Sequence, residues 1–127
     1  MNSIQQAAIR KKSFELNYNG GTIWCEHLDG MGEYEDEVTD KFAEDKSAFT
    51  RPSSSSFMII NLDDTDVTAR IVDMIASTIL ESSKVFAKIA FVGVKPRWHK
   101  QIRTICNKGI AVHFFDDYEK AKEWLMP

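Results

Sequence analysis

Apolar side chains occupy every second position from Phe14 to Tyr18, with polar residues between them. A period of two residues is typical of a strand that buries one face. The segment Asn19-Gly20-Gly21 follows, and these residue types tolerate the positive φ of a tight hairpin turn. A second strand-like segment, TIWCEHL, comes next. The pattern predicts an antiparallel hairpin over about residues 11–28.

The period then changes, because Tyr34, Val38 and Phe42 recur at intervals of four among charged residues. This spacing predicts an amphipathic helix over 33–49. Its outer face is expected to be acidic, with Lys41 and Lys46 as its basic residues. A solvated face with carboxylates near the helix N-terminus is the favoured interpretation, and a docking surface for a basic partner is the alternative.

Residues 57–62 are almost uniformly apolar, as in a strand covered on both faces. An acidic turn over 63–68 joins this strand to a helix that begins at Ala69. Thr68 is placed to act as the N-cap of that helix, because a hydroxyl there accepts from a free backbone N–H. Arg51-Pro52 and the serines of 53–56 are expected to form a loop ahead of the strand.

The remaining chain repeats the alternation of strand and helix. VFAKIAFVGV is the most hydrophobic segment and predicts a central strand, after which Pro96 suits the first position of a helix. Asn107-Lys108-Gly109 is expected to end that helix, and 110–115 predicts a fifth strand. Asp116 and Glu119 have capping-box spacing ahead of a final helix.

The elements therefore predict an α/β fold, a mixed five-stranded sheet with four helices in the order ββαβαβαβα. The 127 residues suffice for one domain without disulfides or metal. We expect a flexible N-terminus over 1–10 and a single domain over 11–127. Cys25 and Cys106 lack CxxC spacing and are interpreted as reduced thiols, although one disulfide between them stays open.

Charge and hydropathy narrow the function classes. A net charge of -3 argues against broad binding of nucleic acid or anionic membranes through the whole surface. No apolar segment approaches the roughly 18 residues of a membrane span, and the start MNSIQQAAIRKK lacks a signal-peptide core. The expected location is the cytoplasm.

Complete catalytic or cofactor motifs are missing from the sequence. GxGxxG, GxxxxGK[ST] and GxSxG do not occur, and His27, His99 and His113 lack the spacing of metal ligands. A tolerated or hydrogen-bonded histidine is the favoured interpretation for His27 and for His113. We therefore expect no catalytic residue, no metal and no cofactor.

Two groups of polar residues remain as candidate sites. Asp63, Asp64 and Asp66 cluster with Thr65 and Thr68 where a strand ends, a place where open sheets bind ligands. Crowded carboxylates could hold a divalent cation, but acidic residues also favour a helix N-terminus, and that explanation is preferred.

The second group is basic and surrounds the start of the third helix: Lys95, Arg97, His99, Lys100 and Arg103. Such side chains could take a phosphate or an acidic partner, while ordinary surface charge is slightly favoured. Trp98 could be an exposed anchor, but its spacing with Ile102 favours packing in the core.

The order of elements and the turn at 63–68 resemble the STAS family, the domain of sulfate transporters and bacterial anti-sigma factor antagonists. The resemblance is greatest to the stand-alone, sporulation anti-anti-sigma-like or STAS/SEC14-like branch. It covers nearly the whole chain through the N-terminal hairpin, the strands MIINL and AFVGV, and the ending VHFFDDYEKAKEWL.

The resemblance implies a mixed sheet with helices and no catalysis. It also implies a function through protein–protein contact or through binding of a small ligand. Anti-sigma factor antagonists carry a phosphorylatable serine in a D-S-S-G motif at the start of the helix after the third strand. This chain has DDTDVTARIVD there, so the serine switch is not carried over, and Thr65 or Thr68 could replace it only as a conjecture.

The leading hypothesis is a non-enzymatic, cytoplasmic regulatory or protein-interaction domain whose partner could be an anti-sigma-type regulator. Its proposed partner- or ligand-binding residues are Asp63, Asp64, Thr65, Asp66, Thr68, Lys95, Arg97, Trp98 and His99. The alternative is a protein of SEC14-like type that binds a small ligand, a lipid or a nucleotide. Whether the chain forms a homodimer is left open.

Overall fold

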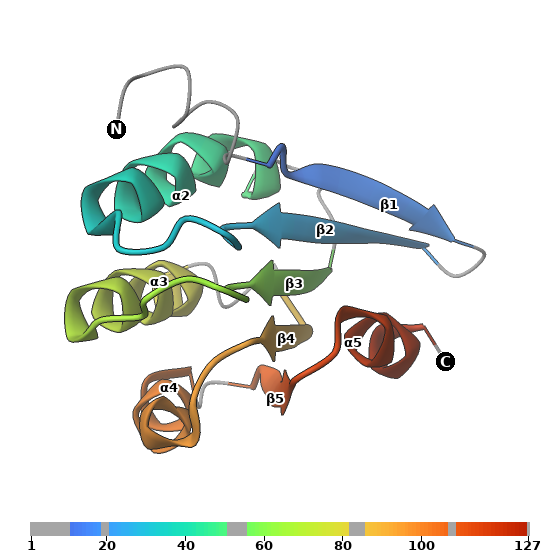
Figure 1. Cartoon of the computed structure of the whole chain (residues 1–127). Helices are drawn as coiled ribbons and strands as arrows, with labels where there is room; N and C mark the ends of the chain where they lie inside the picture. Colours follow the sequence, from blue (N-terminus) through green and yellow to red (C-terminus); the bar gives the residue numbers. More distant parts are fainter. Residues whose placement is uncertain (1–10, 19–20, 51–55, 82–85, 107–108, 127) are drawn as a thin grey trace.

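One mixed sheet with α-helices on both faces makes up the protein (Figure 1). The computed structural model describes residues 11–18, 21–50, 56–81, 86–106 and 109–126. The N-terminus over 1–10, which we expected to be flexible, lies outside these described residues, as do most of the hairpin turn and of the serine loop.

The described residues follow the predicted order of elements. The strands are β1 (Phe14–Tyr18), β2 (Gly21–His27), β3 (Phe57–Asn61), β4 (Lys88–Val92) and β5 (Ala111–Phe115). The helices are α2 (Glu35–Phe49), α3 (Ala69–Glu81), α4 (His99–Cys106) and α5 (Tyr118–Leu125), and a 3₁₀ turn, η1 (Pro96–Trp98), leads into α4. The predicted fold class, a mixed sheet of five strands with four helices, is confirmed for this part of the chain.

The strands lie in the sheet in their sequence order, β1-β2-β3-β4-β5. The hairpin β1–β2 is antiparallel, and the pairs β2–β3, β3–β4 and β4–β5 are parallel. The carboxyl ends of β2 to β5 therefore meet at one edge of the sheet, and the segments that leave them lie next to one another.

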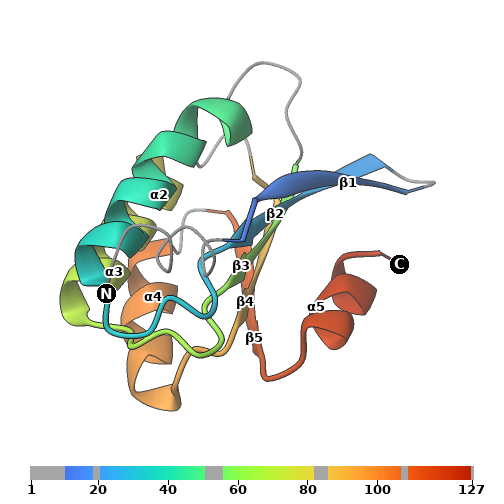
Figure 2. The same cartoon turned by 45° about the horizontal axis from the view of Figure 1, so that its top comes forward.

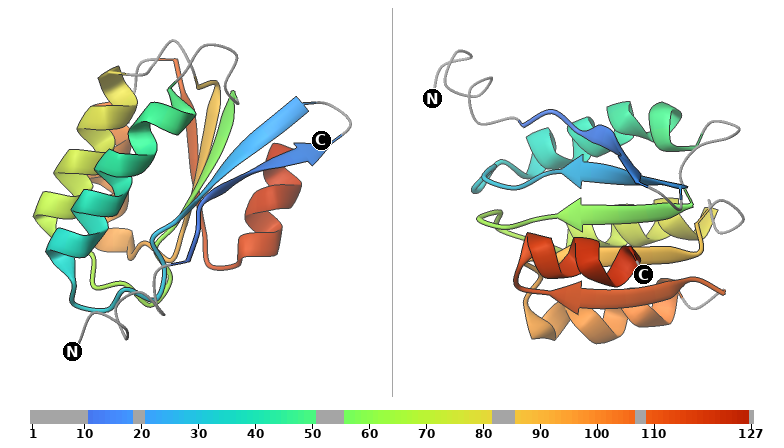
Figure 3. Two further views of the ribbon diagram at one scale, coloured as in Figure 1. Left: turned by 90° about the horizontal axis from the view of Figure 1, so that it is seen from above. Right: turned by 90° about the vertical axis from the view of Figure 1, so that its right-hand side faces the viewer.

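The two faces of the sheet are covered unequally. Of the described helices, α2, α3 and α4 lie on one face and α5 lies on the other, as Figures 2 and 3 show. The large apolar core fills the first layer and includes Phe42, Ile60 and Phe91. A smaller cluster under α5 includes Ile59, Ala90 and Leu125. Because β3 and β4 are covered on both faces, they carry the uniformly apolar sequences from which they were predicted.

Two predicted helix caps have different outcomes. The hydroxyl of Thr68 accepts from the backbone N–H of Ile71 at 3.3 Å, so Thr68 caps α3 as predicted. The cap of α5 is Asp117, whose carboxylate accepts from the N–H of Glu119 at 2.8 Å. The assignment of Asp116 to this role was wrong, because the helix begins one residue later than a box of Asp116 and Glu119 requires.

Lys41 corrects the sequence-based description of α2. It was assigned to the solvated outer face, but it is only 4% exposed and points toward the β1–β2 hairpin. The apolar part of the prediction holds, since Val38 and Phe42 are fully buried.

The two cysteines are free thiols. Cys25 lies in the cluster under α5 and Cys106 in the large core on the other face. The disulfide that the sequence left open does not form.

Candidate functional site at the carboxyl edge of the sheet

Backbone hydrogen bonds join the segments that leave β2 and β3. The N–H of Gly30 donates to the carbonyl of Asp63 at 2.7 Å, and that of Asp66 donates to Gly32 at 2.8 Å. These bonds continue the parallel pairing beyond the strand ends, with an isolated bridge between Gly32 and Thr65. The acidic turn is thereby held beside the start of α2.

The segment that leaves β4 lies against the same turn. Gly93 has a φ of +82°, and a Cβ at this position would lie 2.7 Å from the Cα of Asp63. Only glycine accepts both that conformation and that approach without strain. Its N–H donates to the carbonyl of Phe115 at 3.1 Å, which also fixes the end of β5.

The aspartates of the acidic turn face solvent. Asp63, Asp64 and Asp66 are all exposed, and Asp64 has a φ of +59°, in the left-handed region that Asp tolerates better than most residues. Among the described residues, no group of three or more acidic, histidine or cysteine side chains is arranged to hold a metal ion.

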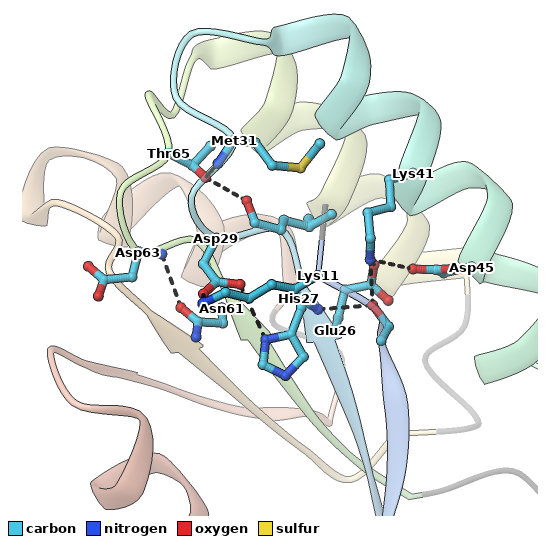
Figure 4. A network of polar contacts seen from close by, with 12 residues as sticks. Lys11, Glu26, His27, Asp29, Met31, Lys41, Asp45, Asn61, Asp63 and Thr65 are labelled. Carbon is cyan, nitrogen blue, oxygen red and sulfur yellow. Dashed lines mark hydrogen bonds and ion pairs between the residues drawn. The ribbon is translucent and has the colours of Figure 1, made fainter. Parts of the chain in front are cut away.

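The two threonines of the turn use their hydroxyls internally. Thr65 donates to the carbonyl of Leu28 at 2.5 Å and accepts from the N–H of Met31 at 3.4 Å, a bridge between loops drawn in Figure 4. Thr68 caps α3 and also donates to the carboxylate of Glu35 at 2.5 Å. That hydrogen bond and one from Arg70 lower the pKa of Glu35.

A small hollow brings together residues of both groups predicted from the sequence. It has a volume of about 90 Å³, and its lining includes Thr65 and Asp66 from one loop with Lys95, Arg97 and Trp98 from the other. The structure thus places most of the predicted site residues around one feature, whereas Asp63, Asp64, Thr68 and His99 lie outside its lining.

A larger hollow of about 300 Å³ adjoins the small one, and both are lined by Gly93 and Lys95. Its other walls include Val94, His99 and Phe114. The Nε2 of His99 donates to the carbonyl of Val94 at 2.8 Å, and the ring stacks on Phe114 with centroids 3.8 Å apart.

The lysines and arginines of the basic group face solvent. Lys95, Arg97, Lys100 and Arg103 are exposed, and none forms an ion pair with another described residue. Arg97 lies over the Trp98 ring at 5.3 Å. Trp98 is half-buried and packs against the large core, as its spacing predicted, and its Nε1 lacks a hydrogen-bond partner among the described atoms.

Sequence reasoning missed a buried polar cluster between β2, β1 and α2 (Figure 4). Lys41 donates to Ser13 at 2.6 Å and to Asp45 at 3.0 Å, and its Nζ lies 3.7 Å from the carboxylate of Glu26. Glu26 is fully buried and accepts from the indole N–H of Trp24 at 2.8 Å.

The burial of Glu26 changes its protonation. Desolvation, followed by a hydrogen bond with Asp45, raises the pKa of Glu26 to about 8. Burial opposes the charge of Asp45 too, but hydrogen bonds with Glu26 and Lys41 lower its pKa below the ordinary value. The alternation in TIWCEHL could have placed Glu26 on the helix-facing side, yet nothing local identifies Lys41 as its partner.

A second polar cluster lies on the other face of the sheet, at the end of β2. The Nδ1 of His27 lies 3.2 Å from one carboxylate oxygen of Asp29, and Lys11 contacts the other at 2.8 Å. Burial alone would raise the pKa of Asp29, but hydrogen bonds from His27 and Lys11 lower it. The interpretation of His27 as a hydrogen-bonded histidine is confirmed. His113 is exposed on β5 and packs against Trp124 at 4.5 Å.

No family model and no curated protein matches this chain. Among the helices of the described residues, none is long and apolar enough to cross a membrane.

Proposed function

We propose that this chain is a non-enzymatic, cytoplasmic regulatory or protein-interaction domain, similar to bacterial anti-sigma factor antagonists but without their D-S-S-G motif. Its partner, which could be an anti-sigma-type regulator, docks on the loops that contain Asp63 to Thr68 and Lys95 to His99. The observation that carries the proposal is the small hollow in which residues of these two loops meet.

The charges at this edge support a contact surface. Asp64, Asp66, Lys95 and Arg97 are exposed and make no ion pair with another described residue, so a partner can approach them without breaking an ion pair between described residues. Both signs are present, and interspersed charges of both signs give specificity to an interface.

Thr65 and Thr68 support the fold of the surface. Phosphorylation of either one would replace a hydroxyl that donates to Leu28 or to Glu35. It would also add about -1.5 to -2 charges beside the aspartates of the turn. We propose that a switch at either residue, if one operates, acts by rearranging these loops.

Cross-linking in the native host followed by affinity purification tests the surface. The test variants are Asp64→Asn with Asp66→Asn, and Lys95→Gln with Arg97→Gln, which remove charge and leave the threonines in place. Asparagine is suitable at residue 64 because it also tolerates positive φ.

The matched control is Lys120→Gln with Glu123→Gln, which changes exposed charges on α5, on the other face of the sheet. We expect a specific partner of the wild type to be kept by the control and lost by at least one loop variant. Recovery of the same partners by all three variants would exclude this surface.

The larger hollow favours a second candidate function, binding of a small ligand such as the lipid or nucleotide of SEC14-like proteins. Its volume of about 300 Å³ lies at the lower end of small-molecule sites, which run from roughly 300 to 1,000 Å³. Native mass spectrometry of protein purified from its own host, repeated after denaturation, would reveal a released ligand. An apo mass in both spectra counts against this function.

A further inference from the structure

The larger hollow has walls that are fixed by contacts within the chain. Gly93 is held between Asp63 and Phe115, and His99 is held by its hydrogen bond to Val94 and its stacking on Phe114. A site whose walls are already ordered loses little conformational entropy when a ligand enters.

Part of the lining is apolar and suits an apolar group. Val94, Pro96, Phe114 and Phe115 contribute apolar surface, while the rings of His99 and Phe114 stack on each other, so the faces that they share are closed to a ligand. Aromatic rings favour offset stacking or edge contacts with such walls. The volume of about 300 Å³ suits a single ring system with a short arm and is too small for a long acyl chain.

The lining also contains two opposite charges. Lys95 follows β4 and Asp116 follows β5, and these strands are paired in parallel with Val92 opposite Phe115. Both charged side chains are exposed, and neither forms an ion pair with another described residue. The apolar walls therefore lie beside one lysine and one aspartate side chain.

We propose that this hollow binds a small aromatic zwitterion, of the chemical class of a free aromatic amino acid. The ring occupies the space beside Val94 and Phe114, the carboxylate pairs with Lys95, and the ammonium pairs with Asp116. The proposal rests on the second candidate function and replaces its lipid or nucleotide with a named chemical class.

Lys95 also lines the small hollow at the proposed partner surface. A carboxylate bound to Lys95 therefore changes the charge available there.

Titration of ¹⁵N-labelled protein followed by NMR tests the proposal. The probes are phenylalanine and tryptophan, then phenethylamine, which lacks the carboxylate, and hydrocinnamate, which lacks the ammonium. We expect saturable binding of the zwitterions with a Kd below about 5 mM. The amide shifts should centre on Gly93, Lys95 and Asp116, and each analogue with one charge should bind at least about threefold more weakly.

Variants assign the two charges. Lys95→Gln should weaken binding of the zwitterion and leave binding of phenethylamine unaffected. Asp116→Asn should also weaken binding of the zwitterion, but it should leave binding of hydrocinnamate unaffected. The controls Lys120→Gln and Glu123→Gln on α5 should bind as the wild type does. Equal affinity for all four probes, shifts centred elsewhere, or an absence of saturation would overturn the proposal.

AMP and decanoate complete the panel and separate this proposal from the function on which it rests. If one of them binds at the hollow and the zwitterions do not, the proposed class is wrong while the ligand-binding function stands. If no probe binds and native mass spectrometry also shows an apo protein, both are wrong.

Discussion

The ammonium of Lys41 lies 3.7 Å from the carboxylate of Glu26, and both side chains are buried between the hairpin and α2. Asp45 and Ser13 complete the contacts of this lysine. The cluster ties the edge strand, its neighbour and the first long helix together, so its charge state affects the stability of the whole N-terminal half.

Glu26 should make stability depend on pH. Its pKa is raised from 4.5 to about 8 by burial and by Asp45, so between these values the folded chain keeps a proton that the unfolded chain releases. Raising the pH through this window therefore lowers the free energy of unfolding. The free energy of unfolding of Glu26→Gln, measured relative to that of the wild type, should therefore rise by on the order of 2–4 kcal/mol from about pH 5 to about pH 8. Urea denaturation of both proteins at the two pH values measures this change. A stability difference between variant and wild type that is the same at both pH values would contradict the prediction.

Lys41→Met should be strongly destabilising, because it removes the cation that pairs with half-buried Asp45 and fully buried Glu26. Loss of one partner from a buried ionic cluster costs about 3–5 kcal/mol. The control is Lys46→Met on the same helix, whose partner Glu81 is exposed. That change should cost less than about 1 kcal/mol in the same denaturation experiment. Similar losses for the two variants would show that Lys41 acts only by packing.

Gly93→Ala should separate steric conflict from backbone strain. Alanine at φ +82° carries a conformational cost of about 1–2 kcal/mol, and its Cβ would also meet the backbone of Asp63 at 2.7 Å. Gly109→Ala is the control, because Gly109 has a similar φ of +87°, and among the described residues that are not its chain neighbours none comes within 4 Å of the added Cβ. We expect the Gly93 variant to lose at least about 1 kcal/mol more than the control in thermal unfolding. Equal losses of stability in the two variants would mean that the turn at Asp63 shifts to accommodate the added methyl group.

Thr65→Val should loosen the link between the first two loops while conserving side-chain volume. The valine cannot donate to Leu28 or accept from Met31, which leaves a net loss of about 1–3 kcal/mol. Hydrogen exchange at the amides of Gly30 and Gly32 should accelerate, since both donate to the turn that Thr65 belongs to. Thr65→Ser keeps the hydroxyl and should exchange as the wild type does. Unchanged protection in the valine variant would show that the backbone hydrogen bonds hold the two loops together without the Thr65 hydroxyl.

Asp117→Ala should cost about 1 kcal/mol, because the carboxylate of Asp117 caps α5. Asp116→Ala, one residue earlier, should change stability by less than about 0.5 kcal/mol. Thermal unfolding of the two variants compares them directly. A larger effect at Asp116 would instead identify Asp116 as the cap of α5, as the sequence had suggested.

Local patterns were sufficient for much of the fold. The alternation around Leu16 predicted β1, and the spacing of Val38 and Phe42 predicted α2, because the side-chain periods of strand and helix are properties of the backbone alone. Thr68 was recognisable as a cap for the same reason, since its partner Ile71 is three residues away. The two polar loops at strand ends were also found, because parallel strands must place their carboxyl ends together.

Only the tertiary structure decided which distant residues meet. From its neighbours along the chain, Lys41 was predicted to be a solvated lysine among acidic residues. Its burial depends on Ser13 and Glu26, which lie outside its helix. The strand order, the closeness of Gly93 to Asp63 and the position of Lys95 and Asp116 around one hollow likewise depend on distances across the sheet. Periodicity assigns a residue to a face, but the energy of a buried charge or the shape of a hollow depends on what packs against that face.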